Sequence, residues 1–347
     1  MEALRVGIVG CGVICWTHGD ALARLAAEGV AQVAGAVDLI PQRSAEFTAK
    51  YGGRQFATYA EMLASDEIDV VTLCTPSGLH GEMAVQAAKA GKHILSEKPL
   101  DVWLPPIDAA IAAAKDANVR YGGIFQKRFA PAVRKVKQAI DRGAFGDIVL
   151  ACTETKWYRG QDYYDSGDWR GTWALDAGVF SNQGIHQVDT VQFLAGDVAE
   201  VLSADLKVGF HRSIEAETAG IATLRFASGA IGTMAMTTLS YNGFSERTDI
   251  CGTRGSAMLV GDRLTEFRTD QPYDDEYGDL VKNPVGSTAT GAGDPRAIGG
   301  DGHYLNIKDF MLAVREGREP YASAAEARRA VSLLNRIYEK AKVGPFA

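Results

Sequence analysis

Residues Val6–Cys15 read V-G-I-V-G-C-G-V-I-C, and this stretch decides the fold. Its apolar run ends in the turn Gly10-Cys11-Gly12, after which an amphipathic pattern begins. This order is typical of a strand, a glycine-rich turn and a helix whose N-terminus binds a dinucleotide pyrophosphate. Gly10 permits the tight turn, and Gly12 lets the backbone approach the phosphates. Cys15 stands where the fingerprint has a third glycine or alanine, so the pattern by itself leaves cofactor binding open.

Apolar segments and helical patterns alternate over the first 124 residues. The predicted strands cover residues 5–9, 32–37, 55–57, 70–74, 93–96 and 119–122. Such alternation predicts a parallel sheet with helices on both faces. We therefore expect an α/β N-terminal Rossmann domain, a doubly wound parallel sheet, over residues 1–124.

The remaining residues, 125–347, carry a different pattern. A helical segment at 130–142 leads to a long strand at 148–157, and strand-like runs separated by turns fill residues 198–268. Two helical patterns end the chain. This predicts an α+β domain with a large open, mostly antiparallel sheet, which we expect to bind substrate and to mediate oligomerisation.

Composition and charge narrow the possible partners. The chain has 347 residues, 46% of them hydrophobic, and a net charge of -7, which argues against binding nucleic acid or an anionic membrane. The five cysteines form no C-x-x-C pair, and the histidines show no metal-ligand spacing. We expect reduced thiols, no metal site, no membrane span and a cytoplasmic location.

Asp38 follows the second predicted strand, where a carboxylate accepts hydrogen bonds from an adenosine ribose. An ordinary turn aspartate is the alternative. A carboxylate here repels a 2′-phosphate, and Leu39 and Ile40 supply no cation, although Arg43 is close behind. The balance favours NAD over NADP.

Two further strand ends carry polar residues. Thr75-Pro76-Ser77 follows the strand at 70–74, with His80 nearby, and Glu97-Lys98-Pro99 follows the strand at 93–96. Ligands of doubly wound sheets bind at the carboxyl ends of their strands. Lys98 is the strongest candidate for a functional role. Most lysines are solvated surface charges, but this one directly follows an apolar strand at the edge of the sheet where ligands bind.

An aromatic and glycine-rich loop follows the long strand of the second domain. Its rings and cations include Trp157, Tyr163, Trp169 and Arg170. Such side chains stack on a sugar ring and hydrogen-bond to its hydroxyls. The alternative is that the rings cover the edge of a sheet.

These motifs together resemble the glucose–fructose oxidoreductase/inositol dehydrogenase/MocA family. The resemblance spans essentially the whole chain and rests on the following segments: Gly10-Cys11-Gly12-Val13-Ile14, Thr75-Pro76-Ser77, Glu97-Lys98-Pro99, Asn182-Gln183-Gly184-Ile185-His186-Gln187-Val188-Asp189 and Gly252-Thr253-Arg254-Gly255. It implies a catalytic lysine at Lys98 and a catalytic histidine at His186. Many relatives have aspartate where this chain has Asn182, which orients a hydroxyl but exchanges no proton at neutral pH.

The residue patterns and the resemblance together give two expected sets of binding residues. Expected cofactor-binding residues are Gly10, Gly12, Val13, Ile14, Asp38, Thr75, Pro76, Ser77, His80, Glu97, Lys98 and Gln126. Expected substrate-binding residues are Arg128, Trp157, Tyr163, Trp169, Arg170, Asn182 and His186. Asn182 is also expected to cap the helix that carries His186.

The sequence thus predicts an NAD-dependent oxidoreductase. It would transfer a hydride between the nicotinamide and a secondary ring hydroxyl of a sugar, sugar derivative or cyclitol, with Lys98 and His186 handling the proton. A redox-neutral glycosidase that retains NAD and a non-catalytic dinucleotide-binding regulator are the alternatives. An open sheet face invites burial by another subunit, so we expect a homodimer or homotetramer.

Overall fold

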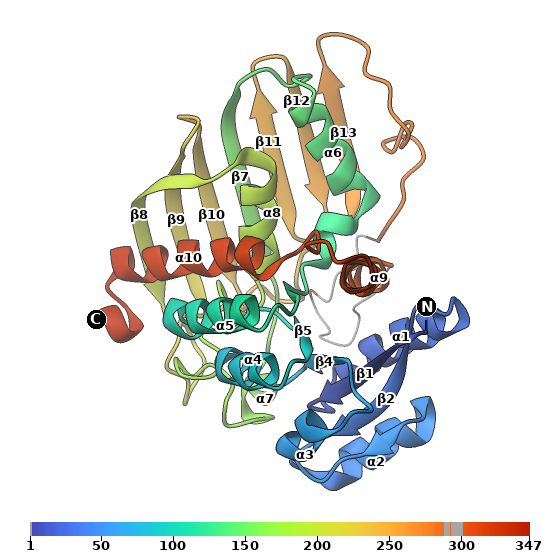
Figure 1. The fold of residues 1–347 in the computed structure, drawn as a ribbon. Coiled ribbons are helices and arrows are strands. Elements are labelled where there is room, and N and C mark those ends of the chain that lie inside the picture. The colour runs from blue at the N-terminus through green and yellow to red at the C-terminus, as the bar shows by residue number, and fades with distance from the viewer. Residues whose placement is uncertain (1, 288–291, 293–300) are drawn as a thin grey trace. The chain divides into compact units, whose positions relative to one another are not determined.

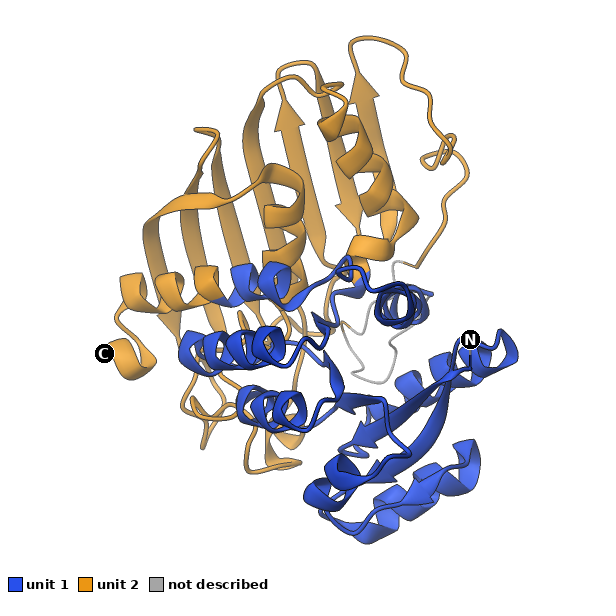
Figure 2. Ribbon diagram, viewed as in Figure 1, with its two compact units in different colours: residues 1–126, 301–331 blue, residues 127–300, 332–347 orange. Residues whose placement is uncertain are grey.

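The computed structural model describes residues 2–287, 292 and 301–347. The chain forms two compact units, shown in Figures 1 and 2. Unit 1 comprises Met1–Gln126 and Asp301–Val331, and unit 2 comprises Lys127–Gly300 and Ser332–Ala347.

Unit 1 is built on a parallel sheet with strand order β3-β2-β1-β4-β5-β6. This is the order of a Rossmann fold, so the predicted doubly wound sheet is confirmed. Its strands are β1 (Leu4–Val9), β2 (Ala31–Val37), β3 (Arg54–Gln55), β4 (Val70–Leu73), β5 (His93–Ser96) and β6 (Tyr121–Gly123). Its helices are α1 (Cys15–Ala27), α2 (Pro41–Tyr51), α3 (Tyr59–Ala64), the short η1 (Ser77–Leu79), α4 (His80–Lys89), α5 (Leu104–Asp116) and α9 (Gly302–Glu316).

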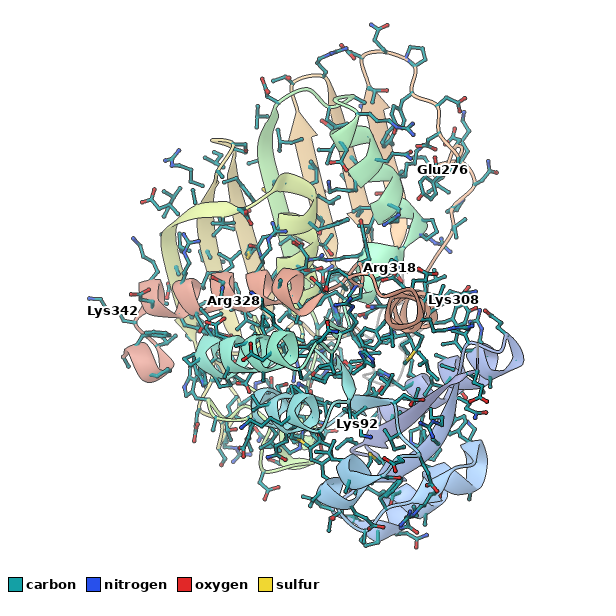
Figure 3. All side chains as sticks on the ribbon, in the orientation of Figure 1. Lys92, Glu276, Lys308, Arg318, Arg328 and Lys342 are labelled. Atoms are coloured by element: carbon teal, nitrogen blue, oxygen red, sulfur yellow. The ribbon has the colours of Figure 1, made fainter. Side chains whose placement is uncertain are left out.

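Helix α9 returns from late in the sequence to complete the core of unit 1. Its Ile307, Phe310 and Met311 are buried in one cluster with Leu22 and Leu25 of α1. Lys308 of α9, labelled in Figure 3, forms an ion pair of 2.6 Å with Glu28 at the end of α1. Residues 301–331 therefore pack with the parallel sheet, whereas the sequence prediction divided the chain once, after residue 124. Apolar periodicity shows that α9 is a helix but not which sheet it covers.

Unit 2 is built on a seven-stranded sheet of order β13-β12-β11-β7-β10-β9-β8. Among the ladders formed by the described residues of this sheet, β7 pairs with β10 in parallel and the other five are antiparallel, which confirms the predicted mostly antiparallel sheet. Its strands are β7 (Ile148–Lys156), β8 (Val198–Lys207), β9 (Ala219–Phe226), β10 (Ile231–Thr237), β11 (Arg247–Gly252), β12 (Gly255–Val260) and β13 (Arg263–Thr269). Its helices are η2 (Gln126–Phe129), which begins on the last residue of unit 1, α6 (Pro131–Asp141), α7 (Gln161–Asp165), α8 (Ile185–Ala195), the second half of α10 (Ala324–Ala341) and η3 (Gly344–Phe346).

Helices α6 and α8 cover one face of this sheet (Figure 1). Along β7, Ala151, Thr153 and Thr155 are buried and alternate with the half-buried Cys152 and Glu154. Side chains of a strand point alternately to the two faces, so the sheet buries one face and leaves the other open. Every residue of α8 is buried, and the helix packs against β7, β11 and α6 of the same unit.

Candidate functional site

The glycine-rich turn between β1 and α1 provides an anion site. Gly10 has φ +89°, and a Cβ on it would lie 2.9 Å from the carbonyl oxygen of Cys74, so only glycine fits. A Cβ on Gly12 would meet no atom of the described residues within 4 Å, so none of these residues closes the turn above Gly12. The N-cap Ile14 makes no side-chain cap, and the first turn of α1 carries no acidic residue. The helix therefore offers N–H groups to a phosphate.

Asp38 joins this turn to the end of β2. Its Oδ2 accepts a hydrogen bond from the N–H of Cys11 (2.6 Å), and its Oδ1 accepts one from the N–H of Ile40 (2.7 Å). The apolar side chains of Val13, Leu39 and Ile40 are exposed beside it. Apolar surface around a fixed carboxylate suits an adenosine, so these residues fit the dinucleotide that the sequence predicts.

Lys98 lies at the carboxyl end of β5, next to a buried histidine–carboxylate contact. Glu97 Oε1 lies 2.7 Å from Nε2 of His18 on α1, and its Oε2 accepts a hydrogen bond from the N–H of Lys98 (3.2 Å). Burial alone would raise the pKa of Glu97. The hydrogen bond from His18, together with the charges of His18, His303 and Lys98, lowers that pKa to about 2. Glu97 is therefore a fixed anion that holds the backbone at Lys98 and ties it to the helix of the glycine-rich turn.

His80 connects the other two polar loops of this edge. Its Nδ1 lies 2.7 Å from the carbonyl oxygen of Pro99, and its Nε2 lies 2.8 Å from that of Thr75. Burial lowers the pKa of His80. The ring thus fixes Thr75-Pro76-Ser77 relative to Lys98-Pro99. Gln126 is half-buried at the end of unit 1.

In unit 2 the predicted aromatic residues gather around one ring. The guanidinium carbon of Arg170 lies 4.1 Å from the ring centre of Tyr163 and 4.5 Å from that of Trp169. The guanidinium carbon of Arg159 lies 5.1 Å from the ring centre of Trp157 and 5.4 Å from that of Tyr163. Tyr163 therefore lies within cation–π distance of two guanidinium groups, in a cluster of aromatic rings and N–H donors.

This cluster adjoins the loop that carries Asn182 and leads to His186. The side chain of Gln183 donates a hydrogen bond to the hydroxyl of Tyr163 (3.4 Å). His186 lies in the first turn of α8 and is 8% exposed. Unit 2 thus brings Trp157, Tyr163, Trp169 and Arg170 to the loop that precedes His186.

Asn182 does not cap α8, contrary to the prediction. The cap position is Gly184, which makes no side-chain cap. The side chain of Asn182 instead donates to Oδ1 of Asp176 (2.5 Å), and Oδ2 of Asp176 accepts from the N–H of Gly171 (2.8 Å). Sequence reasoning missed Asp176, because an aspartate in a glycine-rich loop reads as an ordinary turn residue.

Arg128 is held by α8. Its Nε and Nη2 donate to the two carboxylate oxygens of Asp189 at 2.8 Å and 2.6 Å, and both side chains are almost completely buried. Asp189 lies one turn after His186 on the helix. Arg128 is thus part of the support of His186, and contact of Arg128 with a substrate stays a prediction.

Two family models match the chain and cover most of it. The oxidoreductase family, NAD-binding Rossmann fold, matches residues 4–125, and the GFO/IDH/MocA C-terminal domain matches residues 133–258. The chain belongs to the GFO/IDH/MocA family. It is an oxidoreductase with an NAD-binding Rossmann domain, and the predicted family, fold class and cofactor are confirmed.

Two curated relatives match nearly the whole chain. It is similar to myo-inositol 2-dehydrogenase of Thermotoga maritima, with 26% identity over 95% of this chain and 94% of that protein. It is also similar to levoglucosan dehydrogenase of Pseudarthrobacter phenanthrenivorans, with 26% identity over 98% of this chain and 97% of that protein.

Solved structures show the same fold. The WlbA dehydrogenase from Bordetella pertussis, in complex with NADH and UDP-GlcNAcA, has a TM-score of 0.90 and 32% identity, covering 98% of this chain and 96% of that one. Levoglucosan dehydrogenase with NADH and levoglucosan has a TM-score of 0.82 and 25% identity, covering 98% and 97%. Across residues 2–287, 292 and 301–347, no helix has the length and apolar character needed to cross a bilayer.

Proposed function

We propose that this family member is an NAD-dependent dehydrogenase acting on a secondary ring hydroxyl of a sugar, sugar derivative or cyclitol. The observation that carries the proposal is the position of Lys98. It lies at the carboxyl edge of the parallel sheet that also bears the glycine-rich turn and Asp38, with its backbone held by Glu97. The relatives support the substrate class, since their names specify inositol and levoglucosan and one structure contains UDP-GlcNAcA.

The scheme gives roles to Lys98, His186, Asn182, Trp157 and Trp169. Bound NAD supplies the hydride acceptor. The neutral amine of Lys98 accepts the proton of the substrate hydroxyl, and the imidazole of His186 relays that proton or polarises the carbonyl in the reverse direction. Asn182, oriented by Asp176, hydrogen-bonds to a substrate hydroxyl. The faces of Trp157 and Trp169 stack on the sugar ring.

The experiment is an assay of the purified protein with NAD and a panel of ring hydroxyl compounds, following NADH absorbance. The panel includes myo-inositol, levoglucosan, free hexoses and UDP-GlcNAcA. Substrate-dependent NADH formation supports the proposal. Binding of NAD without reduction by any member of the panel would contradict it, and cleavage of a glycosidic bond with retained NAD would point to the redox-neutral alternative.

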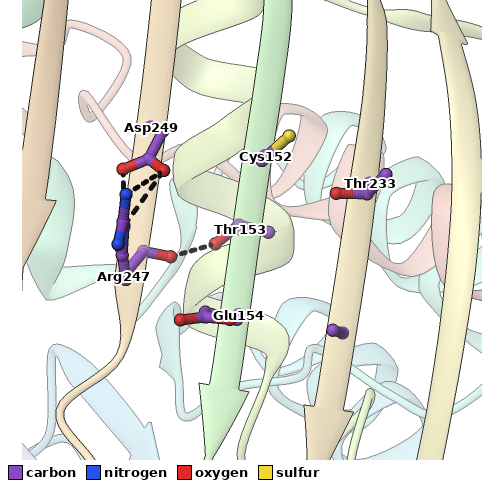
Figure 4. Close-up of a pocket in the computed structure, with 7 residues that line it drawn as sticks. Cys152, Thr153, Glu154, Thr233, Arg247 and Asp249 are labelled. Carbon is purple, nitrogen blue, oxygen red and sulfur yellow. Dashed lines mark hydrogen bonds and ion pairs between the residues drawn. The ribbon is translucent and has the colours of Figure 1, made fainter.

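We propose further that the open face of the seven-stranded sheet joins two copies of the chain. The half-buried Cys152 and Glu154 of β7 and the exposed Thr233 of β10 lie here, beside the ion pair of Arg247 and Asp249 (2.8 Å), around a hollow of about 130 Å³ (Figure 4). Ile221 and Ile231 are 58% and 49% exposed. A face of small and apolar side chains with charges of both signs is suited to a second copy of itself.

Unpaired thiols and use of NAD favour a cytoplasmic location.

A further inference from the structure

Glu217 is, after Asp176, the second buried acidic residue that contacts the loop leading to His186. Glu217 lies two residues before the start of β9, 31 residues after His186, and is only 2% exposed. Its Oε1 accepts a hydrogen bond from the N–H of Phe180 (3.0 Å), and its backbone oxygen accepts one from the N–H of Val179 (2.8 Å). One residue thus holds two consecutive N–H groups of the loop.

Backbone hydrogen bonds connect the restrained residues of the loop to the start of α8. The N–H of Gly184, which caps α8, donates to the carbonyl of Val179 (2.7 Å), and the N–H of Asn182 donates to the carbonyl of Gly178 (2.9 Å). A change at Val179 or Phe180 would therefore move the backbone of Asn182 and the first turn of α8.

The fit around the carboxyl group is tight. A Cβ on Gly178 would lie 2.0 Å from Oε2 of Glu217, so the loop lies directly against the carboxyl group and only glycine is accommodated there. From the other side, the hydroxyl of Tyr338 on α10 donates to Oε1 (3.1 Å). Tyr338 in turn packs edge-on against Trp173, with ring centres 5.1 Å apart.

Burying a carboxyl group at such a position is energetically unfavourable. Burial and the nearby charge of Asp176 raise the pKa of Glu217 to about 8, so at neutral pH it is held as the neutral acid. An apolar side chain would avoid that cost but would leave the buried N–H of Phe180 without this acceptor. The residue is too deeply buried to contact a substrate, which leaves a role in geometry.

We infer that Glu217 is a positioning residue for the reaction: its carboxyl group sets the conformation of residues 178–184 and, through them, the orientation of Asn182 and His186. This inference rests on the proposed function, because it assigns Glu217 to the support of the residues proposed to handle proton and hydroxyl. The group needed is an uncharged acceptor oxygen at the position of Oε1. A glutamine supplies that oxygen, and a leucine does not.

The test compares E217Q, E217L and Y338F with wild type. We expect E217L to lower kcat by about 10- to 100-fold, as small displacements of catalytic groups do, with little change in the Kd for NAD. E217Q should retain kcat near the wild-type value, and Y338F should fall between. The control is E215A: the exposed Glu215 also accepts a backbone N–H (3.0 Å), but from Trp173, which lies outside the 178–184 loop.

Hydrogen exchange measured by mass spectrometry provides a readout that needs no substrate. Peptides covering residues 178–186 should exchange faster in E217L than in wild type, while those of β1 and α1 should not. Wild-type exchange in E217L, or E217Q as impaired as E217L, would overturn the inference. Should E217L fail to fold, E217Q and Y338F carry the test. Absence of any dehydrogenase activity in wild type would refute the proposed function alone, because the exchange experiment still decides the role of Glu217.

Discussion

Lys98 and Lys92 lie at opposite ends of the same strand, β5, and this makes them a matched pair. We expect K98M to lose turnover by about 10²- to 10⁴-fold, the usual contribution of a positioned acid or base, and to retain NAD binding. K92M should keep wild-type turnover. The Nζ of Lys92 donates to the carbonyls of Ser65 and Ile68 at the amino end of the strand, away from the polar loops. Steady-state kinetics and NAD titration check both, and normal turnover by K98M would contradict the mechanism.

Glu217 also makes a prediction about stability and pH. Its pKa is about 8 in the folded protein, against an ordinary value of 4.5, with Asp176 and Tyr338 facing it. Between these two values the unfolded chain has released the proton while the folded chain keeps it, so folding is penalised increasingly as pH rises. The amide that E217Q introduces does not titrate. The stability of E217Q relative to wild type should therefore rise from pH 5 to 8, by at most about 1.4 kcal/mol per pH unit, and then level off.

Thermal unfolding of E217Q and wild type across this pH range measures the difference. E215Q is the control, and its difference from wild type should not rise over the same interval. A constant difference between E217Q and wild type would show that Glu217 is ionised in the folded protein at neutral pH.

The sequence predicts those site residues that directly follow a recognisable strand. Gly10, Asp38 and Lys98 each follow an apolar strand, and the carboxyl ends of parallel strands meet at one edge. The partners that fix these residues were not predictable. His18 is 79 positions from Glu97, and Glu217 is 37 positions from Phe180, so their contacts exist only once the chain has folded. Asp176 was missed for a different reason: its partners are only five and six positions away, but an aspartate in a glycine-rich loop looks like an ordinary turn residue.

At the scale of elements, the pair of Arg128 and Asp189 joins η2 to α8. Both side chains are nearly inaccessible to solvent and the contact is bidentate. Removing one side chain would therefore leave the other charge buried without its partner. We expect R128L to lower the free energy of unfolding by about 3–5 kcal/mol. The double variant R128L/D189L should recover part of this loss. Denaturant unfolding measures all three proteins.

An exposed pair serves as the comparison. Arg268 and Glu266 form an ion pair of 2.9 Å on β13, with side chains 79% and 49% exposed. R268L should change the free energy of unfolding by less than about 1 kcal/mol. Equal losses for R128L and R268L would show that the bond to α8 is not a structural anchor.

The elements themselves followed from local patterns, but their grouping did not. The strands of both sheets were predicted because each is a short apolar or alternating run bounded by turn residues. The pairing of β7 with β10, 81 residues apart at their facing positions Leu150 and Ile231, follows from no local pattern. The same is true of α9, which joins the sheet of unit 1.

At the scale of the whole molecule, the open sheet face predicts assembly in solution. We expect sedimentation or light scattering to show a homodimer or homotetramer. A235R places a long cation among the small side chains around the hollow and should shift the protein toward monomer. V281R, at a half-exposed position between residues 278 and 287, should leave assembly unchanged. A monomeric wild type would contradict the proposed interface.

Because α9 packs with the first sheet, it decides which fragments of this protein can be expressed on their own. A fragment ending at Gln126 would leave bare the apolar surface that Ile307, Phe310 and Met311 cover, and we expect it to aggregate when expressed. Splicing Asp301–Val331 onto that fragment through a flexible linker should yield a soluble miniature that still binds NAD. The NAD-binding unit of this enzyme could then be produced separately. It would have to include both of its segments, because a single break in the sequence does not separate the two units.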